Sequence, residues 1–256
     1  MSFPQYPKNH KASVLITPKQ HLQAGAEQII EFDAPNSVIL CFEGDLMDYY
    51  RQMNTTTSHR FWTGELLSLG EANNKIALVG GFGIGGPAAA HMLEALIAMG
   101  IKKFVTVGHA GGLQLTNPIG SLVLVEKAIR DEGVSHHYAD SERFAYPSQS
   151  LTGKLSKTLQ RMNQPYNTGS SWTIDSMYRE TMEEIAYYQS EGIDIVEMEL
   201  ASLFTVADFR KVDLAAVVVI SDYIGGDQWR QGIYSKDTST GLLSASLVAQ
   251  KALLAK

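Results

Sequence analysis

Short apolar stretches alternate with amphipathic stretches along most of the chain. Runs of β-branched and other apolar residues, bounded by turn-forming residues, predict buried strands at 37–42, 75–80, 103–107, 121–128 and 214–220. Apolar residues that repeat at three- and four-residue spacing predict helices at 87–99, 181–190, 196–209 and 244–254. Strands that alternate with helices predict an α/β fold, here a three-layer sandwich around a central mixed, largely parallel sheet.

Local signals support two of these helices and the absence of an internal boundary. Pro87 suits a first helical turn, and Thr181 and Glu184 have the spacing of a capping box. The most loop-like stretch is 140–150, which is too short to act as a long linker. Because no repeat or low-complexity segment divides the chain, we expect a single domain over residues 1–256.

Composition narrows the class of protein. The net charge of −6 disfavours a nucleic-acid-binding surface, although it allows a local cluster of positive charge. The one cysteine, Cys41, lies in an apolar run and is expected to be a buried hydrophobic residue. The chain has no apolar run long enough to span a membrane and no signal-peptide pattern at its start. We therefore expect a cytoplasmic protein with no membrane partner.

Two predicted strands end in glycine-rich turns. The first turn, at 81–86, has the G-x-G-x-x-G spacing of a dinucleotide site. Such a site also needs an acid at the end of the next strand, but that position holds the second glycine turn, at 108–112. A dinucleotide is therefore disfavoured. Both turns are expected at carboxyl ends of strands, where α/β sheets bind ligands, although tight-turn geometry alone is the simpler explanation of each.

Two acids, Glu197 and Glu199, stand at the start of the predicted helix 196–209. Acids are common at helix N-termini because the helix dipole favours them, so this position alone is ambiguous. The neighbouring residues are apolar, however, and a partly buried carboxylate needs hydrogen-bond donors. A pair of ribose hydroxyls supplies such donors, at about 1.5–3 kcal/mol for each charge-assisted bond.

A third acid, Asp222, directly follows the predicted strand 214–220. It could be a turn former or a helix cap. In the functional interpretation it is a general acid: it protonates a nucleobase as the bond between base and ribose breaks.

Taken together, these segments resemble the nucleoside phosphorylase family, which includes uridine phosphorylases and hexameric purine nucleoside phosphorylases. Related nucleosidases, which use water in place of phosphate, share the fold. The resemblance covers roughly residues 36–224, and its segments are 83–87 (Gly-Ile-Gly-Gly-Pro), 108–112 (Gly-His-Ala-Gly-Gly), 128–133 (Ala-Ile-Arg-Asp-Glu-Gly), 175–180 (Asp-Ser-Met-Tyr-Arg-Glu), 196–199 (Val-Glu-Met-Glu) and 219–222 (Val-Ile-Ser-Asp).

The resemblance implies a site with parts for sugar, base and nucleophile. It places the ribose at Glu199, Met198 and Glu197, the base at Met177, Tyr178, Arg179 and Gly111, the general acid at Asp222, and phosphate at Gly44, Arg60 and His109. It also implies no metal and no organic cofactor, with inorganic phosphate as co-substrate, and a homo-oligomer built from dimers, as large as a hexamer. Asp222 favours a purine base, whereas the 130–133 segment is closer to the uridine branch.

The sequence departs from the family pattern where phosphate binds. Leu46 and Asp48 occupy positions where the family has proline and arginine, and Thr106 occupies the position of a second arginine. Losing both arginines removes the donors that phosphate prefers, although Arg60 matches an arginine lent across a dimer interface and His109 can add a donor. Three hypotheses follow: a phosphorylase for a purine or uridine-type nucleoside, a hydrolase that uses water, and a nucleoside-binding protein without turnover.

Smaller signals complete the prediction. The 225–230 segment after Asp222 is expected to form a loop over the site, with Arg230 supporting Asp222 or a substrate anion. The three tryptophans, at 62, 172 and 229, are expected in the core or at interfaces. His136 and His137 are adjacent, and no pair of cysteines or spaced histidines suggests a metal site.

Overall fold

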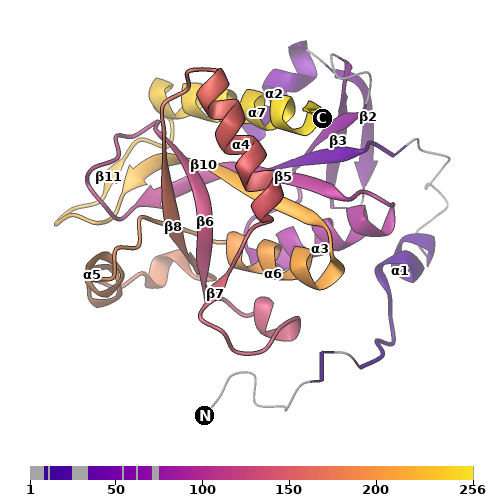
Figure 1. The fold of residues 1–256 in the computed structure, drawn as a ribbon, viewed down its shortest axis with the longest axis horizontal. Helices are drawn as coiled ribbons and strands as arrows, with labels where there is room; N and C mark the ends of the chain where they lie inside the picture. The colour runs from indigo at the N-terminus through magenta and orange to yellow at the C-terminus, as the bar shows by residue number, and fades with distance from the viewer. Residues whose placement is uncertain are drawn as a thin grey trace.

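The protein is described by a computed structural model that covers residues 9–10, 12–24, 34–53, 55–61, 63–70 and 75–255. Its strands form one mixed sheet (Figure 1): β1 (Ser37–Cys41), β2 (Thr55–Phe61), β3 (Gly64–Leu69), β4 (Ile76–Gly80), β5 (Lys103–Gly112), β6 (Leu122–Asp131), β7 (Phe144–Ala145), β8 (Tyr166–Ile174), β9 (Ile195–Glu197), β10 (Asp213–Tyr223) and β11 (Arg230–Gln231). The α-helices are α1 (Pro18–Ala24), α2 (Gly44–Met53), α3 (Gly86–Ala98), α4 (Gln149–Arg161), α5 (Met182–Ser190), α6 (Leu200–Arg210) and α7 (Lys236–Leu254).

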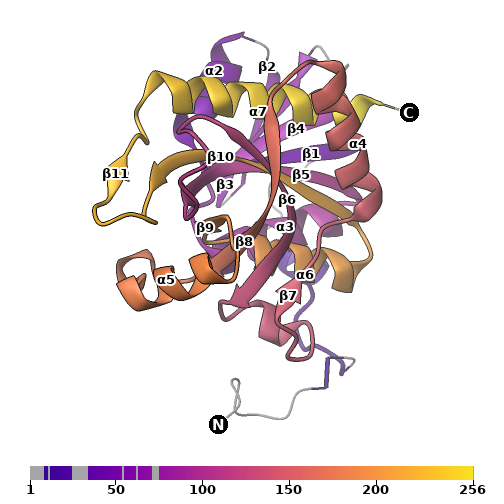
Figure 2. The ribbon, with the colours of Figure 1, turned by 60° about the vertical axis from the view of Figure 1, so that its left-hand side comes forward.

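The sheet has a parallel centre and antiparallel margins. Strands β4, β1, β5 and β10 run parallel, while β2 and β3 extend one edge in antiparallel pairing. On the other side, β5, β10, β6, β8 and β9 pair in a closed circuit (Figure 2). The carboxyl ends of β5 and β10 and the short strand β9 therefore meet at one rim of this circuit.

Helices cover both faces of the sheet (Figure 1). On one face α3 and α6 pack side by side, and on the other lie α2, α4 and α7. Strand β1 shows why both faces are covered. Val38 and Leu40 belong to the hydrophobic cluster that includes α3 and α6, while Ile39 and Cys41 belong to the cluster on the opposite face. Side chains alternate across a strand, so a continuous apolar run must be covered on both sides. The predicted three-layer α/β fold is confirmed.

Most predicted elements are confirmed, but two predictions are wrong in part. The glycine segment 108–112 is not a turn: it continues β5 and pairs with β10. The helix at 196–209 is wrong at its start. Residues 195–197 form β9, in which Val196 pairs with Gly111 of β5 and Trp172 of β8, and α6 begins only at Leu200. The capping box at Thr181 and Glu184 is present. None of the described helices is long and apolar enough to cross a membrane.

The first glycine turn joins β4 to α3 and brings α3 against α6. Gly85 has a positive φ of 89°, a conformation that glycine adopts without strain. At Gly86, a Cβ atom would lie 2.3 Å from the Ser202 hydroxyl oxygen of α6. Glycine at 86 is therefore required by the close approach of these two helices.

This contact gives a first prediction. Replacing Gly86 with alanine should lower the free energy of unfolding by about 1–3 kcal/mol, because the added methyl group overpacks the contact with Ser202. The matched control is Gly153→Ala in α4, where no atom lies within 4 Å of the new Cβ and the helix should gain about 0.5–1 kcal/mol. Urea unfolding of both variants measures the difference; equal stability of the two would contradict the packing argument.

Candidate active site

A cavity of about 480 Å³ lies at the carboxyl ends of β1, β5 and β10. Residues from β9 and from the 3₁₀ turn η3 (Met177–Arg179) complete its wall. It brings together eight of the residues singled out in the sequence: His109, Gly111, Met177, Tyr178, Glu197, Met198, Glu199 and Asp222. These residues are spread over more than 100 positions of the chain, and the sheet topology collects them at one rim.

Three other predicted site residues do not line this cavity. Gly44 opens α2, and Arg60 lies on the edge strand β2, exposed and paired in register with Glu65. Arg179 lines a separate hollow together with Asp131 and Glu184. Successive side chains of a 3₁₀ turn point about 120° apart, so Arg179 faces away from Met177 and Tyr178. Trp62 lies outside the described residues.

Glu199 is held at the start of α6 by the first glycine turn. Its carboxylate accepts a hydrogen bond from the Gly85 N–H (2.6 Å) and another from the Met198 N–H (3.3 Å), and the residue is 7% exposed. Burial raises the pKa of Glu199 to about 8; the neighbouring charge of Glu197 adds to the rise, and the Gly85 bond opposes it. The carboxylate is thus fixed in place and poorly solvated, so it would gain from further donors.

Glu197 has a different environment from Glu199. Its carboxylate accepts hydrogen bonds from the hydroxyls of Ser171 and Thr173 and from the backbone N–H groups of Glu199 and Leu200. Burial nevertheless raises its pKa. With four protein donors, Glu197 serves to tie β8 to the turn between β9 and α6, and it thereby positions Glu199.

Asp222 lies where the pairing register of β10 with β5 shifts, between Ile220 and Asp222. One carboxylate oxygen accepts from the Ser221 hydroxyl (2.6 Å) and the other from the indole N–H of Trp229 (2.7 Å). The loop after β10 therefore does reach the site, as expected. Its contact is Trp229 rather than Arg230, whose guanidinium lies 4.7 Å over the ring of Tyr223.

Two acids of the cavity were not recognised in the sequence, Glu43 and Glu180. Glu43 follows β1 and accepts from the His109 N–H (3.0 Å), with the His109 Nδ1 atom 3.7 Å away. Burial raises the pKa of Glu43, and His109 opposes the rise. Glu180 follows η3; burial, then the charges of Asp222 and Glu184, raise its pKa to about 7. The position of Glu43 directly after a buried strand was an available signal, and Glu180 is the last residue of the family-like segment 175–180.

The electrostatic character of the cavity is acidic. Its described lining includes five carboxylates and His109, but no arginine or lysine. Thr106, at the position of a family arginine, is buried and donates to the Leu40 carbonyl (3.5 Å). Asp48, which stands at the position of the other family arginine, forms an ion pair with Arg51. The described residues that line the cavity therefore provide no arginine fork for a phosphate.

The 128–133 motif lies outside this cavity, and the contacts of its Arg130 hold a neighbouring loop in place. The guanidinium of Arg130 donates to the carbonyls of Ala139, Asp140 and Glu142. Its contacts secure the loop-like stretch that the sequence suggested after residue 139, which contains the short strand β7.

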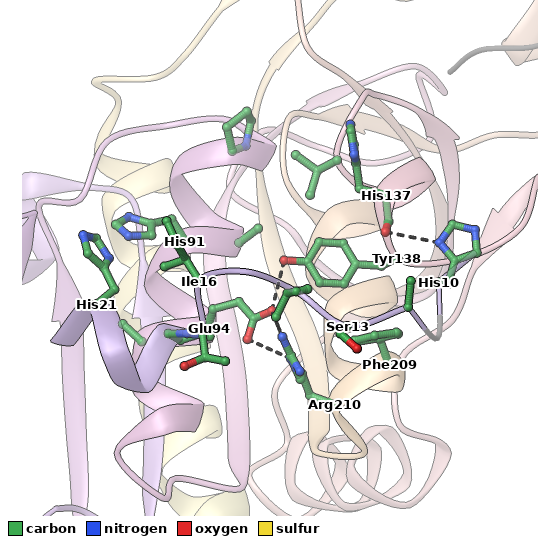
Figure 3. Close-up of a pocket in the computed structure, with 18 of the residues that line it drawn as sticks. His10, Ser13, Ile16, His21, His91, Glu94, His137, Tyr138, Phe209 and Arg210 are labelled. Carbon is green, nitrogen blue, oxygen red and sulfur yellow. Dashed lines mark hydrogen bonds and ion pairs between the residues drawn. The ribbon is translucent and has the colours of Figure 1, made fainter. Parts of the chain in front are cut away.

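A larger cavity, of about 1110 Å³, lies between residues 9–10 and 12–22, α3 and α6 (Figure 3). Its central charges satisfy one another: Glu94 accepts from the Tyr138 hydroxyl (3.0 Å) and from two nitrogens of Arg210. The labelled side chains of Figure 3 include no predicted site residue. Eight of the predicted site residues line the smaller cavity instead.

Comparison with known proteins identifies the family. A family model described as the phosphorylase superfamily matches residues 38–250. The chain therefore belongs to the nucleoside phosphorylase family, which confirms the resemblance inferred from the sequence.

Its relatives carry several activities in their names. The chain is 26% identical over 147 residues to a guanosine phosphorylase of Halorubrum lacusprofundi, with 57% of this chain and 61% of the relative covered. It is 30% identical to a uridine phosphorylase of Treponema pallidum, with 54% and 58% covered. The chain thus spans about three fifths of the length of these curated relatives.

Solved structures show the same fold. A uridine phosphorylase from Vibrio fischeri has a TM-score of 0.75 and 27% identity, with 86% of this chain and 92% of that chain covered. An AMP nucleosidase from Bacteroides thetaiotaomicron has the same TM-score at 22% identity, with 93% and 96% covered. The fold is therefore shared by proteins named for phosphate-dependent cleavage and by one named a nucleosidase.

Proposed function

We propose that this chain cleaves the N-ribosidic bond of nucleosides. The observation that carries the proposal is the placement of Glu199 and Asp222 in one cavity: a buried carboxylate anchored by the Gly85 N–H, and a second one near the carboxyl end of β10. Glu199 accepts hydrogen bonds from the ribose hydroxyls, because a buried carboxylate needs such donors. Asp222 protonates the base as it leaves.

The remaining lining residues suit a sugar and a flat base. Met198 lies beside Glu199 and packs on the ribose, while Glu197 holds that segment in place through its four donors. Met177 and Tyr178 stand at the opening, 47% and 91% exposed, where a base would cover them. Exposed large apolar side chains at a cavity mouth are typical of a ligand site.

For the nucleophile, the contacts of Glu43 favour water, whereas the names of the relatives favour phosphate. A phosphate ion would lie close to Glu43, and His109 is the one basic side chain among the described lining residues. It would need Arg60 from a neighbouring subunit of a homo-oligomer. A water molecule, in contrast, can lose a proton to Glu43, whose raised pKa makes it a better base. Hydrolysis is thus the candidate that this geometry supports best, and phosphorolysis is the alternative.

A nucleoside panel assayed with and without phosphate tests the function. We expect release of free base and ribose at the same rate in both conditions, and a loss of about 100-fold in Glu43→Gln. Glu126→Gln, which removes an exposed charge on β6, is the matched control and should keep the rate. Strict dependence on phosphate with ribose 1-phosphate as product would establish phosphorolysis instead, and absence of turnover on the whole panel would overturn the proposed cleavage.

A further inference from the structure

Glu180 is a carboxylate that the proposed chemistry leaves unused. It lines the cavity beside Met177 and Tyr178. Its pKa is raised by burial and by the like charges of Asp222 and Glu184, and no donor opposes this rise. Across the described chain, no side chain or backbone group donates a hydrogen bond to its carboxylate. Glu199 and Asp222, in contrast, each accept two hydrogen bonds from the protein.

The surroundings of Glu180 offer few donors to a base. No arginine, lysine, asparagine or glutamine is among the described residues that line the cavity. The Ser221 hydroxyl and the Trp229 indole N–H are both directed at Asp222. The base end of the cavity is therefore rich in acceptors, with Tyr178 as the exposed hydroxyl at its mouth.

This excess of hydrogen-bond acceptors over donors discriminates between classes of base. The uracil of a nucleoside presents one N–H flanked by two carbonyl oxygens, and these oxygens would lie against carboxylates with no donor to bond to them. A purine with an exocyclic amino group presents N–H donors, and a carboxylate that accepts them forms charge-assisted hydrogen bonds. A buried polar group left unpaired by the wrong substrate is a strong source of selectivity.

We propose that Glu180 is a specificity-determining residue that accepts hydrogen bonds from the amino group of a purine base and disfavours pyrimidines with two carbonyl groups. The inference rests on the proposed function in that it uses the base end of the same site. It names the substrate class, aminopurine nucleosides, and it assigns the selection to a residue other than Asp222.

Calorimetric titration of the full chain with free adenine and free uracil tests the proposal without requiring turnover. We expect adenine to bind at least about tenfold more tightly than uracil, since a hydrogen bond to a charged group contributes about 1.5–3 kcal/mol. In Glu180→Gln, adenine affinity should fall about tenfold or more while uracil affinity stays the same or rises, because the amide adds a donor. Glu183→Gln, an exposed acid in the first turn of α5, should change neither.

The same variants in the cleavage assay separate this proposal from the proposed function. If adenosine is cleaved faster than uridine and Glu180→Gln narrows that ratio, both stand. If no nucleoside is cleaved but adenine binding depends on Glu180, the base selection stands and the catalytic proposal fails. An unchanged adenine-to-uracil ratio in a folded Glu180→Gln protein, verified by circular dichroism, overturns the role of Glu180.

Discussion

Replacing Glu199 with glutamine should nearly abolish nucleoside cleavage while making the folded chain more stable. The ribose hydroxyls donate to Glu199 and thereby favour its ionised form in the complex. The loss in kcat/KM is expected to be about 100-fold or more, because glutamine replaces these charge-assisted bonds, each worth about 1.5–3 kcal/mol, with neutral ones. The amide oxygen can still accept from the Gly85 N–H, so the variant should keep its fold. Steady-state kinetics on the preferred nucleoside measure the effect.

The stability gain follows from the pKa of Glu199, which burial raises to about 8 from an ordinary value of 4.5. Between these two values the folded chain binds more protons than the unfolded chain, so folding becomes less favourable as the pH rises. The slope is at most about 1.4 kcal/mol per pH unit for one group. Glutamine removes this penalty, and its advantage should grow from pH 5 to pH 8 and then level off.

Glu197→Gln is the informative contrast. Its carboxylate faces four protein donors, and an amide NH₂ placed among them would leave donors unpaired, so this variant should lose stability. Urea unfolding of both variants at pH 5, 6.5 and 8 makes the comparison. A Glu199→Gln protein that is less stable than the parent at pH 8, or that turns over normally, would contradict the proposed state of Glu199.

Replacing Asp222 with asparagine should slow cleavage by at least about 100-fold, the usual contribution of general acid catalysis. The amide oxygen can still accept from the Trp229 indole N–H, and its NH₂ group can donate to the Ser221 hydroxyl oxygen, so binding should change less than kcat. Asp227→Asn, an exposed acid in the same loop, serves as the control. Single-turnover kinetics report the chemical step directly, and a near-normal rate in Asp222→Asn would remove this residue from the role of acid.

The sequence predicted the sheet and the principal acids for a physical reason. Buried parallel strands appear as continuous apolar runs, and ligand groups collect at their carboxyl ends, so Asp222 and the first glycine turn could be predicted from the sequence. The second glycine segment, 108–112, was expected to be a turn but continues β5, because its backbone pairs with β10. The start of α6 could not be predicted, because β9 has only three residues and its strand conformation depends on pairing with Gly111 and Trp172. Tertiary pairing decided that segment, not local propensity.

The same limit applies within the site. The hydrogen bond between Gly85 and Glu199 joins residues 114 positions apart, and no local sequence pattern predicts it. Glu180 is a single acid in a loop, and only the fold shows that it lines the same cavity as Asp222 and lies close enough for their charges to interact. Arg179 belongs to the family-like segment, but its backbone turn directs it into another hollow.

The hydrogen bond from Trp229 to Asp222 gives the site an optical property. Trp229 is 62% exposed and bonded to a carboxylate, so its indole emission should respond when a base enters beside Asp222. Trp172 is fully buried and donates to Asp131, and it provides a steady background. With Trp62 replaced by phenylalanine, the intrinsic fluorescence of the chain would become a direct readout of ligand occupancy at the site. Trp229, which donates a hydrogen bond to Asp222, would supply the signal.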